Sequence, residues 1–518
     1  MSSQKNESLN RLVAVNTASN YVLTFIRVLQ GILITRWLYH YLGDDYYGFW
    51  SILWAFFTYM IVFNLGFGAA TQKYTAEHLF EKDPEKYNGV ISIIFSFYAA
   101  VSLLITVVVL VGAAYITSWT GLADPVKIST CRHALIIFGV GTAILFPLAM
   151  FSDILAGLRL IYLKNSVLLF IRILEAVGVL LMMWLDWGFI GIVTFSVSIN
   201  IIFNYLMIFM VKRHIKTFKL HFRFSRATFK EICNFSALVY INSISSLIIA
   251  KTDRFVLGAI LGLPSVSSYQ LGTRMPEIGQ TLSSQFQDNV VPVSANLIHS
   301  GDTKRLSSIL LSGMRFGAFA SVGVTVLFYM LTDATIQFLF KVNSPEISLI
   351  CKVFLISQFV TCAIRGVPSR YLLMSGRHKF VAYCTAAEAS ANIALSIFLC
   401  YRMGIMGVVW GTLIPNVIIS LFVMLPPAVR ALNFDVRELI LIFLKPALAI
   451  IIPALICEYA ISKFGVSISD FAPLFFTYFA AGSAYLALSW FFVITHAERE
   501  MMLAKIPFIK KFLCRKSA

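Results

Sequence analysis

Several charged side chains stand inside long apolar stretches of this sequence, at spacings that bring them onto one face of a helix. Lys251 and Arg254 are three residues apart and share such a face, with Asp253 between them. Two cations that converge in a partly dry cavity suit the binding of an oxyanion group. The alternatives are a structural ion pair with Asp253 and side chains that extend to a polar interface.

Other cations extend this candidate set. Arg27 lies midway along the first apolar stretch, with Asn20 and Gln30 at helical spacing, so one face of that helix is polar and should point into the bundle. Charges placed inside apolar helices are costly and mark candidate functional sites. The remaining cations that we expect at a binding cavity are Arg274, Arg315 and Arg365.

Three carboxylates are candidates for coupling to a cation: Asp253, Glu277 and Glu388. Glu388 has no cation within four residues along the chain, which favours protonation or sodium binding, whereas a neutral carboxyl packed against a neighbouring helix is the alternative. Glu277 follows Arg274 by three residues across Pro276, so an internal pair is the alternative there. Arg172 and Glu175 repeat this spacing, and for them we expect a structural pair.

The elements that hold these residues are apolar stretches that fill almost the whole chain. Of 518 residues, 58% are hydrophobic and 13% charged, and the mean hydropathy is +0.81. Because a membrane span needs roughly 20 apolar residues, we predict an all-α polytopic membrane protein with about 14 transmembrane helices. The predicted spans lie near 12–36, 47–71, 88–115, 133–157, 165–185, 188–211, 232–261, 266–293, 306–331, 347–375, 380–401, 405–429, 438–461 and 471–495.

Lysine and arginine gather in alternate gaps between the spans. By count, about 26 basic residues fall on the side of the N-terminus and about six on the other side, which predicts that both termini face the cytoplasm. The first helix is expected to act as a signal anchor, without a cleavable signal peptide. The net charge of +17 is then explained by loops that face anionic membrane lipids, and no nucleic-acid partner is predicted.

An internal repeat organises the chain. Shifting the sequence by about 219 residues aligns several landmarks. The aligned landmarks are Leu42-Gly43 with Leu261-Gly262, Asp83 with Asp302, Gly157 with Gly376 and, at a slightly smaller offset, Gly188 with Gly404. Each unit has six helices, an even number, so the chain starts both units from the same side of the membrane. We therefore predict two six-helix bundles related by a pseudo-two-fold axis along the membrane normal.

The repeat sets the predicted domain boundaries. They are an N-terminal bundle over 1–211, a basic cytoplasmic linker over 212–230, a C-terminal bundle over 231–430, two additional helices over 431–496 and a basic tail over 497–518. Alternating basic and aromatic residues favour a linker that lies along the inner leaflet, with an ordinary solvated loop as the alternative.

Motifs for metals, disulfides and nucleotides are not evident in the sequence. The eight cysteines are spread singly, mostly in apolar stretches, and no histidine spacing is typical of a metal site. We therefore predict no cofactor and no metal. No phosphate-binding G-x-x-x-x-G-K-[ST] loop occurs, so an ATP-driven pump is not predicted.

The segment from Tyr41 to Asp83 carries a recognisable series of motifs. A Leu-Gly turn is followed by Tyr47-Gly48, by Asn64-Leu65-Gly66-x-Gly68 and by a basic and aromatic run that ends at Ala76-Glu77. This series resembles the polysaccharide transporter family of the multidrug/oligosaccharidyl-lipid/polysaccharide exporter (MOP) superfamily, and within it the O-antigen (Wzx-type) flippases. Many relatives carry an acidic residue where this chain has Asn64.

The resemblance implies a transporter of the bacterial inner membrane, involved in O-antigen, lipopolysaccharide, capsule or exopolysaccharide synthesis. It implies that a polyprenyl-diphosphate-linked oligosaccharide moves between leaflets by alternating access, with membrane lipids and possible polysaccharide polymerase and chain-length proteins as partners. The residues expected to bind the diphosphate and glycan are Arg27, Lys251, Arg254, Arg274, Arg315 and Arg365.

Three alternatives stay open. The first is a cation-coupled antiporter for drugs or small molecules in the same superfamily. The second is a membrane-embedded polysaccharide-biosynthesis enzyme, which would need a sizeable extramembrane loop or a clustered carboxylate pair, whereas the gaps here are short. The third is a scaffold for a biosynthetic complex, which the intramembrane charges disfavour.

Overall fold

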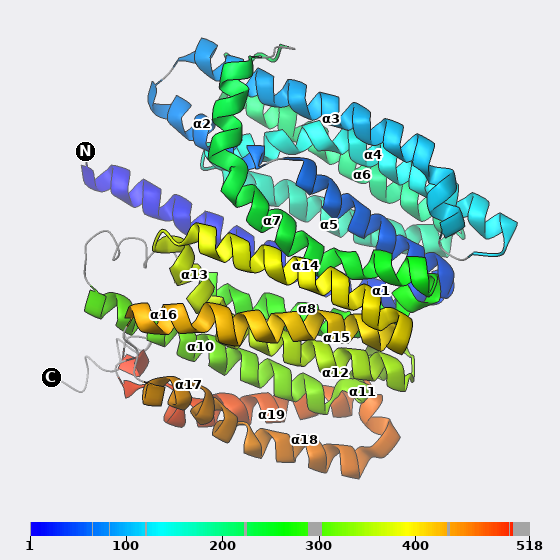
Figure 1. Ribbon diagram of the computed structural model, residues 1–518, viewed down its shortest axis with the longest axis vertical. Helices are drawn as coiled ribbons and strands as arrows, with labels where there is room; N and C mark the ends of the chain where they lie inside the picture. The colour runs from blue at the N-terminus through cyan, green and yellow to red at the C-terminus, as the bar shows by residue number, and fades with distance from the viewer. Residues whose placement is uncertain are drawn as a thin grey trace. The chain divides into compact units, whose positions relative to one another are not determined.

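The computed structural model describes residues 2–64, 66–81, 83–119, 122–221, 225–288, 303–432, 436–496 and 498–500. These residues are almost entirely helical, and no strand occurs among them (Figure 1). Within them, 11 helices are long and apolar enough to cross a membrane. The predicted all-α polytopic class is therefore confirmed. The landmark Asp302 and nearly all of the predicted basic tail lie outside the described residues.

Contacts divide the chain into two compact units. The first comprises Met1–Gln270 and Cys400–Ile405, and the second comprises Leu271–Leu399 and Met406–Ala518. The helices of the first unit are α1 (Ser2–Met60), η1 (Ile61–Asn64), α2 (Phe67–Glu81), α3 (Pro84–Trp119), α4 (Pro125–Gly157), α5 (Ile161–Trp184), α6 (Gly188–His214), α7 (Arg226–Ile260) and the first part of α8 (Leu263–Asp288).

The second unit continues from α8. Its further helices are α10 (Thr303–Met330), α11 (Thr332–Phe340), α12 (Pro345–Phe359), η2 (Val360–Arg365), α13 (Gly366–Met374), α14 (His378–Met403, except its last residues), α15 (Ile405–Ile418), η3 (Ile419–Met424), α16 (Leu425–Leu432), α17 (Val436–Ala449), α18 (Ile451–Phe464), η4 (Gly465–Ser469) and α19 (Phe471–Phe492).

In the described residues the predicted spans fall largely on helical backbone, although the helices divide differently, and 289–293 of the span 266–293 lie outside the described residues. The first two spans lie largely in one helix, α1, which is interrupted by non-helical backbone at Gly43. The spans near 232–261 and 266–293 correspond to α7 and α8. α8 is not among the 11 candidates, because charged and polar residues interrupt its apolar character.

The turns of the predicted repeat share an unusual backbone conformation. Gly43 and Gly262 both have positive φ angles, 69° and 86°, and so do Gly188 and Gly404, at 65° and 62°. Glycine reaches this left-handed region without the steric cost that a Cβ atom brings. These two pairs of landmarks therefore correspond in backbone geometry as well as in sequence, whereas Gly376 has a positive φ angle of 80° and its counterpart Gly157 is the last residue of α4.

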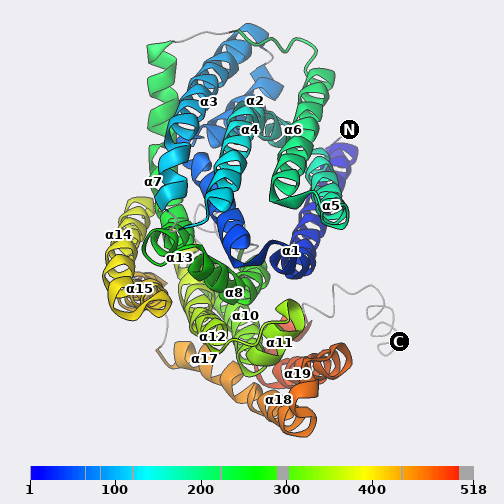
Figure 2. The same ribbon diagram turned by 90° about the vertical axis from the view of Figure 1, so that its right-hand side faces the viewer.

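The first unit has its core between α3, α4 and α6. These helices run side by side in Figures 1 and 2, with α2 against α4. Phe67, Tyr98 and Phe151 are among the buried side chains of this core. The outward face of α3 is apolar as well, with Leu103 68% and Val111 67% exposed. An apolar outer face is what a lipid environment requires.

In the second unit, two long helices change their winding midway. α12 passes through the π-helical segment η2 into α13, and α15 passes through the π-helical segment η3 into α16. The two π segments pack against each other. Such segments are rare and occur often at functional sites.

Candidate functional site

In the first unit, Arg27 stands beside an ion pair whose carboxylate is buried. On α5, Arg172 Nη1 donates to Glu175 Oε2 at 3.0 Å, and Gln30 Nε2 on α1 approaches the same oxygen at 3.5 Å. Glu175 is buried, whereas Arg27 is exposed and within electrostatic range of Arg172. Of the three charged residues in this group, two are cations and one is an anion. The group therefore has an excess positive charge that favours an anionic ligand.

The polar face predicted for α1 contacts α5 over much of its length. Asn165 Nδ2 donates to Asn20 Oδ1 at 2.6 Å and to Ser19 Oγ at 2.8 Å. Near the far end, Tyr41 Oη donates to Asp186 Oδ1 at 2.8 Å. These hydrogen bonds satisfy polar groups that would be costly to expose to lipid. Asn20 and Gln30 therefore contact α5, whereas Arg27 on the same face is exposed.

The three charged residues of α7 also belong to the first unit. Asp253 and Arg254 are buried, at 1% and 5% exposure, and Lys251 is partly buried. Tyr269 Oη donates to Asp253 Oδ2 at 2.5 Å. A hydrogen bond also joins Tyr59 of α1 to Thr252. The site residues of α7 are therefore held on a helix that packs on α1.

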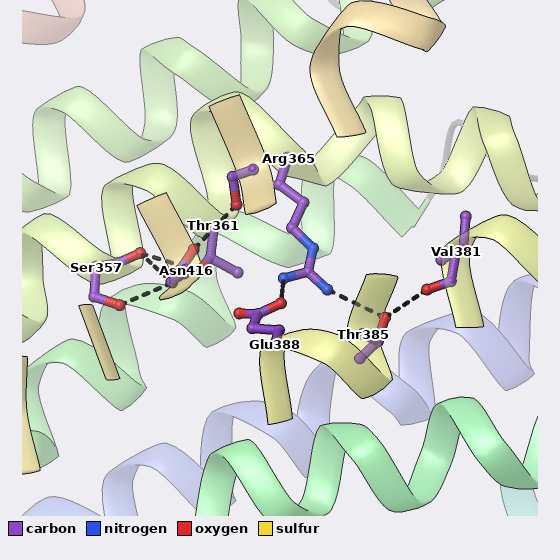
Figure 3. Close-up of polar contacts among 8 residues, drawn as sticks. Ser357, Thr361, Arg365, Val381, Thr385, Glu388 and Asn416 are labelled. Atoms are coloured by element: carbon purple, nitrogen blue, oxygen red, sulfur yellow. Dashed lines mark hydrogen bonds and ion pairs between the residues drawn. The ribbon is translucent and has the colours of Figure 1, made fainter. Parts of the chain in front are cut away.

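In the second unit, Arg365 and Glu388 form a buried ion pair. The Arg365 guanidinium lies between the carboxylate of Glu388 and the hydroxyl of Thr385, to which Nη2 donates at 3.4 Å (Figure 3). The side chain of Glu388 is 3% exposed and that of Arg365 is 15% exposed. Arg365 comes from η2, whereas Glu388 comes from α14. The cationic partner of Glu388 is therefore Arg365, which lies on a different helix.

A cluster of neutral polar groups lies beside this pair. Asn416 Nδ2 donates to Ser357 Oγ at 2.9 Å and to Thr361 Oγ1 at 2.7 Å, as drawn in Figure 3. Its carbonyl oxygen accepts from Ser420 Oγ at 3.1 Å. Ser420 belongs to η3 and Thr361 to η2, so Asn416 ties the two π segments together.

The other two candidate cations of the second unit also lie beside carboxylates. Arg274 Nη1 is 3.4 Å from Glu277 Oε2 on α8. Arg315 Nη1 on α10 donates to both carboxylate oxygens of Glu498, at 2.8 Å each. Anion binding by any of these arginines would compete with a carboxylate already in place.

Glu498 itself forms a helix start. The backbone N–H and the hydroxyl of Thr495 donate to Glu498 Oε2 at 2.9 and 2.7 Å, and the bond from the N–H is one half of a capping box. The ion pair to Arg315 therefore attaches the segment after α19 to α10.

Asp153 is a polar residue of the membrane region that the sequence reasoning missed. Its Oδ1 accepts from Gln72 Nε2 at 3.0 Å, and a Cβ atom on Gly68 would stand 2.7 Å from Oδ2. Asn64 Oδ1 accepts from the Gly68 N–H at 3.0 Å and from the hydroxyl of Tyr98. The Asn64 to Gly68 motif therefore forms a helix start that Asp153 of α4 approaches closely. Its position inside an apolar stretch was the signal that could have identified Asp153.

Within the described part of the chain, no group of three or more histidine, cysteine, aspartate or glutamate residues gathers as a metal site. The polar groups described above form ion pairs and hydrogen bonds, and several of them are cations within helices.

Comparison with known proteins assigns the family. The model of the family described as polysaccharide biosynthesis protein matches residues 41–342, more than half of the chain. The chain belongs to the polysaccharide biosynthesis protein family. The match includes the segment Tyr41 to Asp83, so the predicted family is confirmed. The comparison with curated proteins found no match.

Solved structures show the fold. A structure titled lipid II flippase MurJ, inward closed conformation, is 17% identical, with a TM-score of 0.69 over 92% of this chain and 98% of its own. An inward-facing multidrug resistance MATE family transporter of the MOP superfamily is 14% identical, with a TM-score of 0.63 over 79% and 94%. A MOP superfamily transporter from Pyrococcus furiosus is 15% identical, with a TM-score of 0.55 over 81% and 94%.

Family and fold together define this protein at a coarse level. It is a multi-pass membrane protein with the fold of MOP superfamily transporters, and it belongs to a polysaccharide biosynthesis family. The transporter fold expected from the sequence is therefore confirmed.

Proposed function

We propose that this protein is a flippase that moves a polyprenyl-diphosphate-linked oligosaccharide across the bacterial cytoplasmic membrane by alternating access. The glycan would be an O-antigen, capsule or exopolysaccharide repeat unit. Family membership supports a role in polysaccharide synthesis, and the similarity to a lipid II flippase supports a lipid-linked substrate. A polysaccharide polymerase and chain-length proteins would be the partners that receive the product.

The observation that carries this proposal is the set of cations on α1 and α7. Arg27, Lys251 and Arg254 stand within helices of the first unit, where charged side chains are expensive and mark candidate functional sites. A diphosphate group suits such cations, because each arginine can donate two hydrogen bonds to phosphate oxygens. In the second unit, Arg274, Arg315 and Arg365 would contribute only after release from their carboxylates.

A leaflet-exchange assay tests the proposal. The purified protein is reconstituted into liposomes that contain a fluorescent polyprenyl-diphosphate oligosaccharide, and movement between leaflets is followed by quenching from outside. We expect transport by the wild type and a loss of about a hundredfold in the Lys251→Ala, Arg254→Ala double variant, since hydrogen bonds to charged groups contribute about 1.5–3 kcal/mol each. Lys251→Arg with Arg254→Lys keeps both charges and should retain more of the activity.

The control variant is Lys73→Ala with Lys86→Ala, which removes the same charge from exposed positions. Equal activity of the α7 variant and this control would place the diphosphate elsewhere. No movement of any lipid-linked glycan by a folded wild type, together with gradient-driven export of small cations, would favour the antiporter that the similarity to MATE transporters suggests.

For energy coupling, we propose a cation or proton that acts on Glu388, Asp253 or Glu277. Glu388 is the first to test, because neutralising it would release Arg365. Transport is measured under an imposed sodium or proton gradient in Glu388→Gln and in Glu346→Gln, a control at the start of α12. Loss of gradient dependence in Glu388→Gln alone would support the proposal, whereas an unchanged dependence would exclude this residue.

A further inference from the structure

The first unit contains a pocket that none of the candidate transport residues lines. It has a volume of about 610 Å³ and lies between α3, α4 and α6, where residues 218–221 of the connection from α6 to α7 close it. Its walls belong entirely to the first unit. Arg27, Lys251 and Arg254 do not line it, so its role is separate from the proposed diphosphate site.

The connection is fixed in place over this pocket. Asn88 Nδ2 on α3 donates to the Thr217 carbonyl at 2.8 Å, and Asn88 Oδ1 accepts from the Lys219 N–H at 3.2 Å. The His221 N–H donates to Ser92 Oγ at 3.0 Å. Phe218 is 7% exposed and packs on Phe151 with ring centroids 6.0 Å apart. The pocket is therefore preformed by a segment that α3 and α4 hold.

The walls and the rim of the pocket differ in chemistry. Phe95, Leu148 and Ile208 form part of an apolar wall, which extends to Ile144 and Tyr205, exposed by 40% and 54%. Exposed apolar residues on spanning helices face lipid, so the wall is continuous with a lipid-facing surface.

The rim of the same pocket is basic. It carries Lys212, Lys219 and His221, all exposed, and the lining residues that the structure describes include no carboxylate. Basic pockets between transmembrane helices bind anionic lipid headgroups. The charge pattern places this end of the unit in the cytoplasm, where anionic lipids are available.

We propose that this pocket binds a membrane phospholipid with an anionic headgroup, such as phosphatidylglycerol. The phosphate would lie at Lys212, Lys219 and His221, and an acyl chain would follow the wall past Ile144. Burial of methylene groups on the wall adds to the affinity and distinguishes a lipid from free phosphate, which could use the basic rim alone. The bound lipid would fix the connection between the sixth and seventh helices to the membrane.

Binding to the purified full-length protein tests this site. Native mass spectrometry and thermal unfolding are recorded with phosphatidylglycerol, phosphatidylcholine or inorganic phosphate added to the delipidated protein in detergent. We expect binding and a rise in Tm with phosphatidylglycerol only, because a ligand that binds the folded state raises its stability. Equal effects of phosphatidylcholine would overturn the anionic specificity, and displacement of the lipid by equimolar inorganic phosphate would reassign the pocket to the free ion.

Two matched pairs of variants locate the binding. Lys212→Gln, Lys219→Gln and His221→Gln together should weaken phosphatidylglycerol binding at least about tenfold, given the contribution of each basic residue near anionic lipid. The control is Arg213→Gln, Lys216→Gln and His214→Gln, which removes the same kinds of charge from the same segment outside the pocket. An equal loss of affinity in the two triple variants would mean that only the net charge matters, and it would contradict the proposed site.

The second pair leaves the charge unchanged. Ile144→Trp should narrow the pocket and weaken binding, whereas Ile202→Trp, on the exposed face of α6 and outside the pocket, should not. If the triple variant fails to fold, this pair decides the question, and wild-type affinity in Ile144→Trp would contradict the proposal.

Discussion

At the scale of single residues, the Arg365 and Glu388 pair is the most informative contact of the second unit. Both groups are largely buried, so each depends on the other for compensation of its charge. Removal of one partner from a buried pair costs about 3–5 kcal/mol, because it leaves an uncompensated charge. A replacement of both by apolar residues of similar volume can be nearly neutral.

We therefore predict that Glu388→Leu lowers the free energy of unfolding by about 3 kcal/mol and that Arg365→Met in the same chain restores most of it. Denaturant unfolding of the purified protein in detergent measures both. Equal destabilisation in the single and double variants would mean that the pair contributes through other contacts.

The Gly68 position allows a second test at this scale. A Cβ atom there would stand 2.7 Å from Asp153 Oδ2, so Gly68→Ala must displace α4 or the aspartate, and we expect a lowered Tm. The control is Gly89→Ala in α3, where nothing lies within 4 Å of the added Cβ. Because alanine favours a helix by about 0.5–1 kcal/mol over glycine, the control should be neutral or stabilising. A stable Gly68→Ala variant would show that Asp153 is free to move.

Ion pairs within one helix could be predicted from the sequence, but ion pairs between helices could not. The pairs Arg172 with Glu175 and Arg274 with Glu277 could be anticipated, because residues three apart on a helix are neighbours. The partner of Glu388 could not, since Arg365 belongs to another helix and helical spacing carries no information about packing between helices.

At the scale of elements, hydropathy alone places the helices well, because a span of roughly 20 apolar residues is a strong signal. The predicted spans correspond to helical segments throughout the described residues. The π segments η2 and η3 were not predicted. Beside them, Asn416 donates to Ser357 and Thr361, residues more than fifty positions away in the sequence, and such a contact between helices has no signal in hydropathy.

The attachment of the C-terminal segment to α10 gives a prediction that depends on pH. Burial raises the pKa of Glu498, but hydrogen bonds from Ser312 and Thr495 and the charge of Arg315 outweigh it, so the pKa lies below its usual 4.5. A depressed carboxyl pKa contributes stability above the unfolded value, and this contribution is lost as the pH falls through the folded value.

We expect amide hydrogen exchange over 493–500 to be slow near neutral pH and to accelerate, after correction for intrinsic rates, as the pH falls below 4.5 through the lowered pKa of Glu498. Glu498→Gln should show the faster exchange at neutral pH already, while Glu500→Gln, at an exposed position, serves as the control. Identical exchange in both variants would rule out the attachment as the stabilising contact.

At the scale of the whole molecule, the distribution of basic residues predicts the orientation. A single cysteine introduced at Lys216, in the exposed connection after α6, should react with a membrane-impermeant maleimide only after the inner membrane is opened. A cysteine at Asp124, before α4, should react from the periplasm. The native cysteines that the structure describes are buried, which limits background labelling. The reverse pattern would invert the predicted topology.

The paired left-handed turns bear on the origin of the chain. If a short ancestral gene was duplicated, drift would erase most side-chain identities, because many apolar residues serve equally well against lipid. A backbone conformation with positive φ tolerates far fewer replacements. Under such a duplication, Gly43 with Gly262 and Gly188 with Gly404 would retain the ancestral alignment, and an alignment of the two halves should be anchored on these four positions.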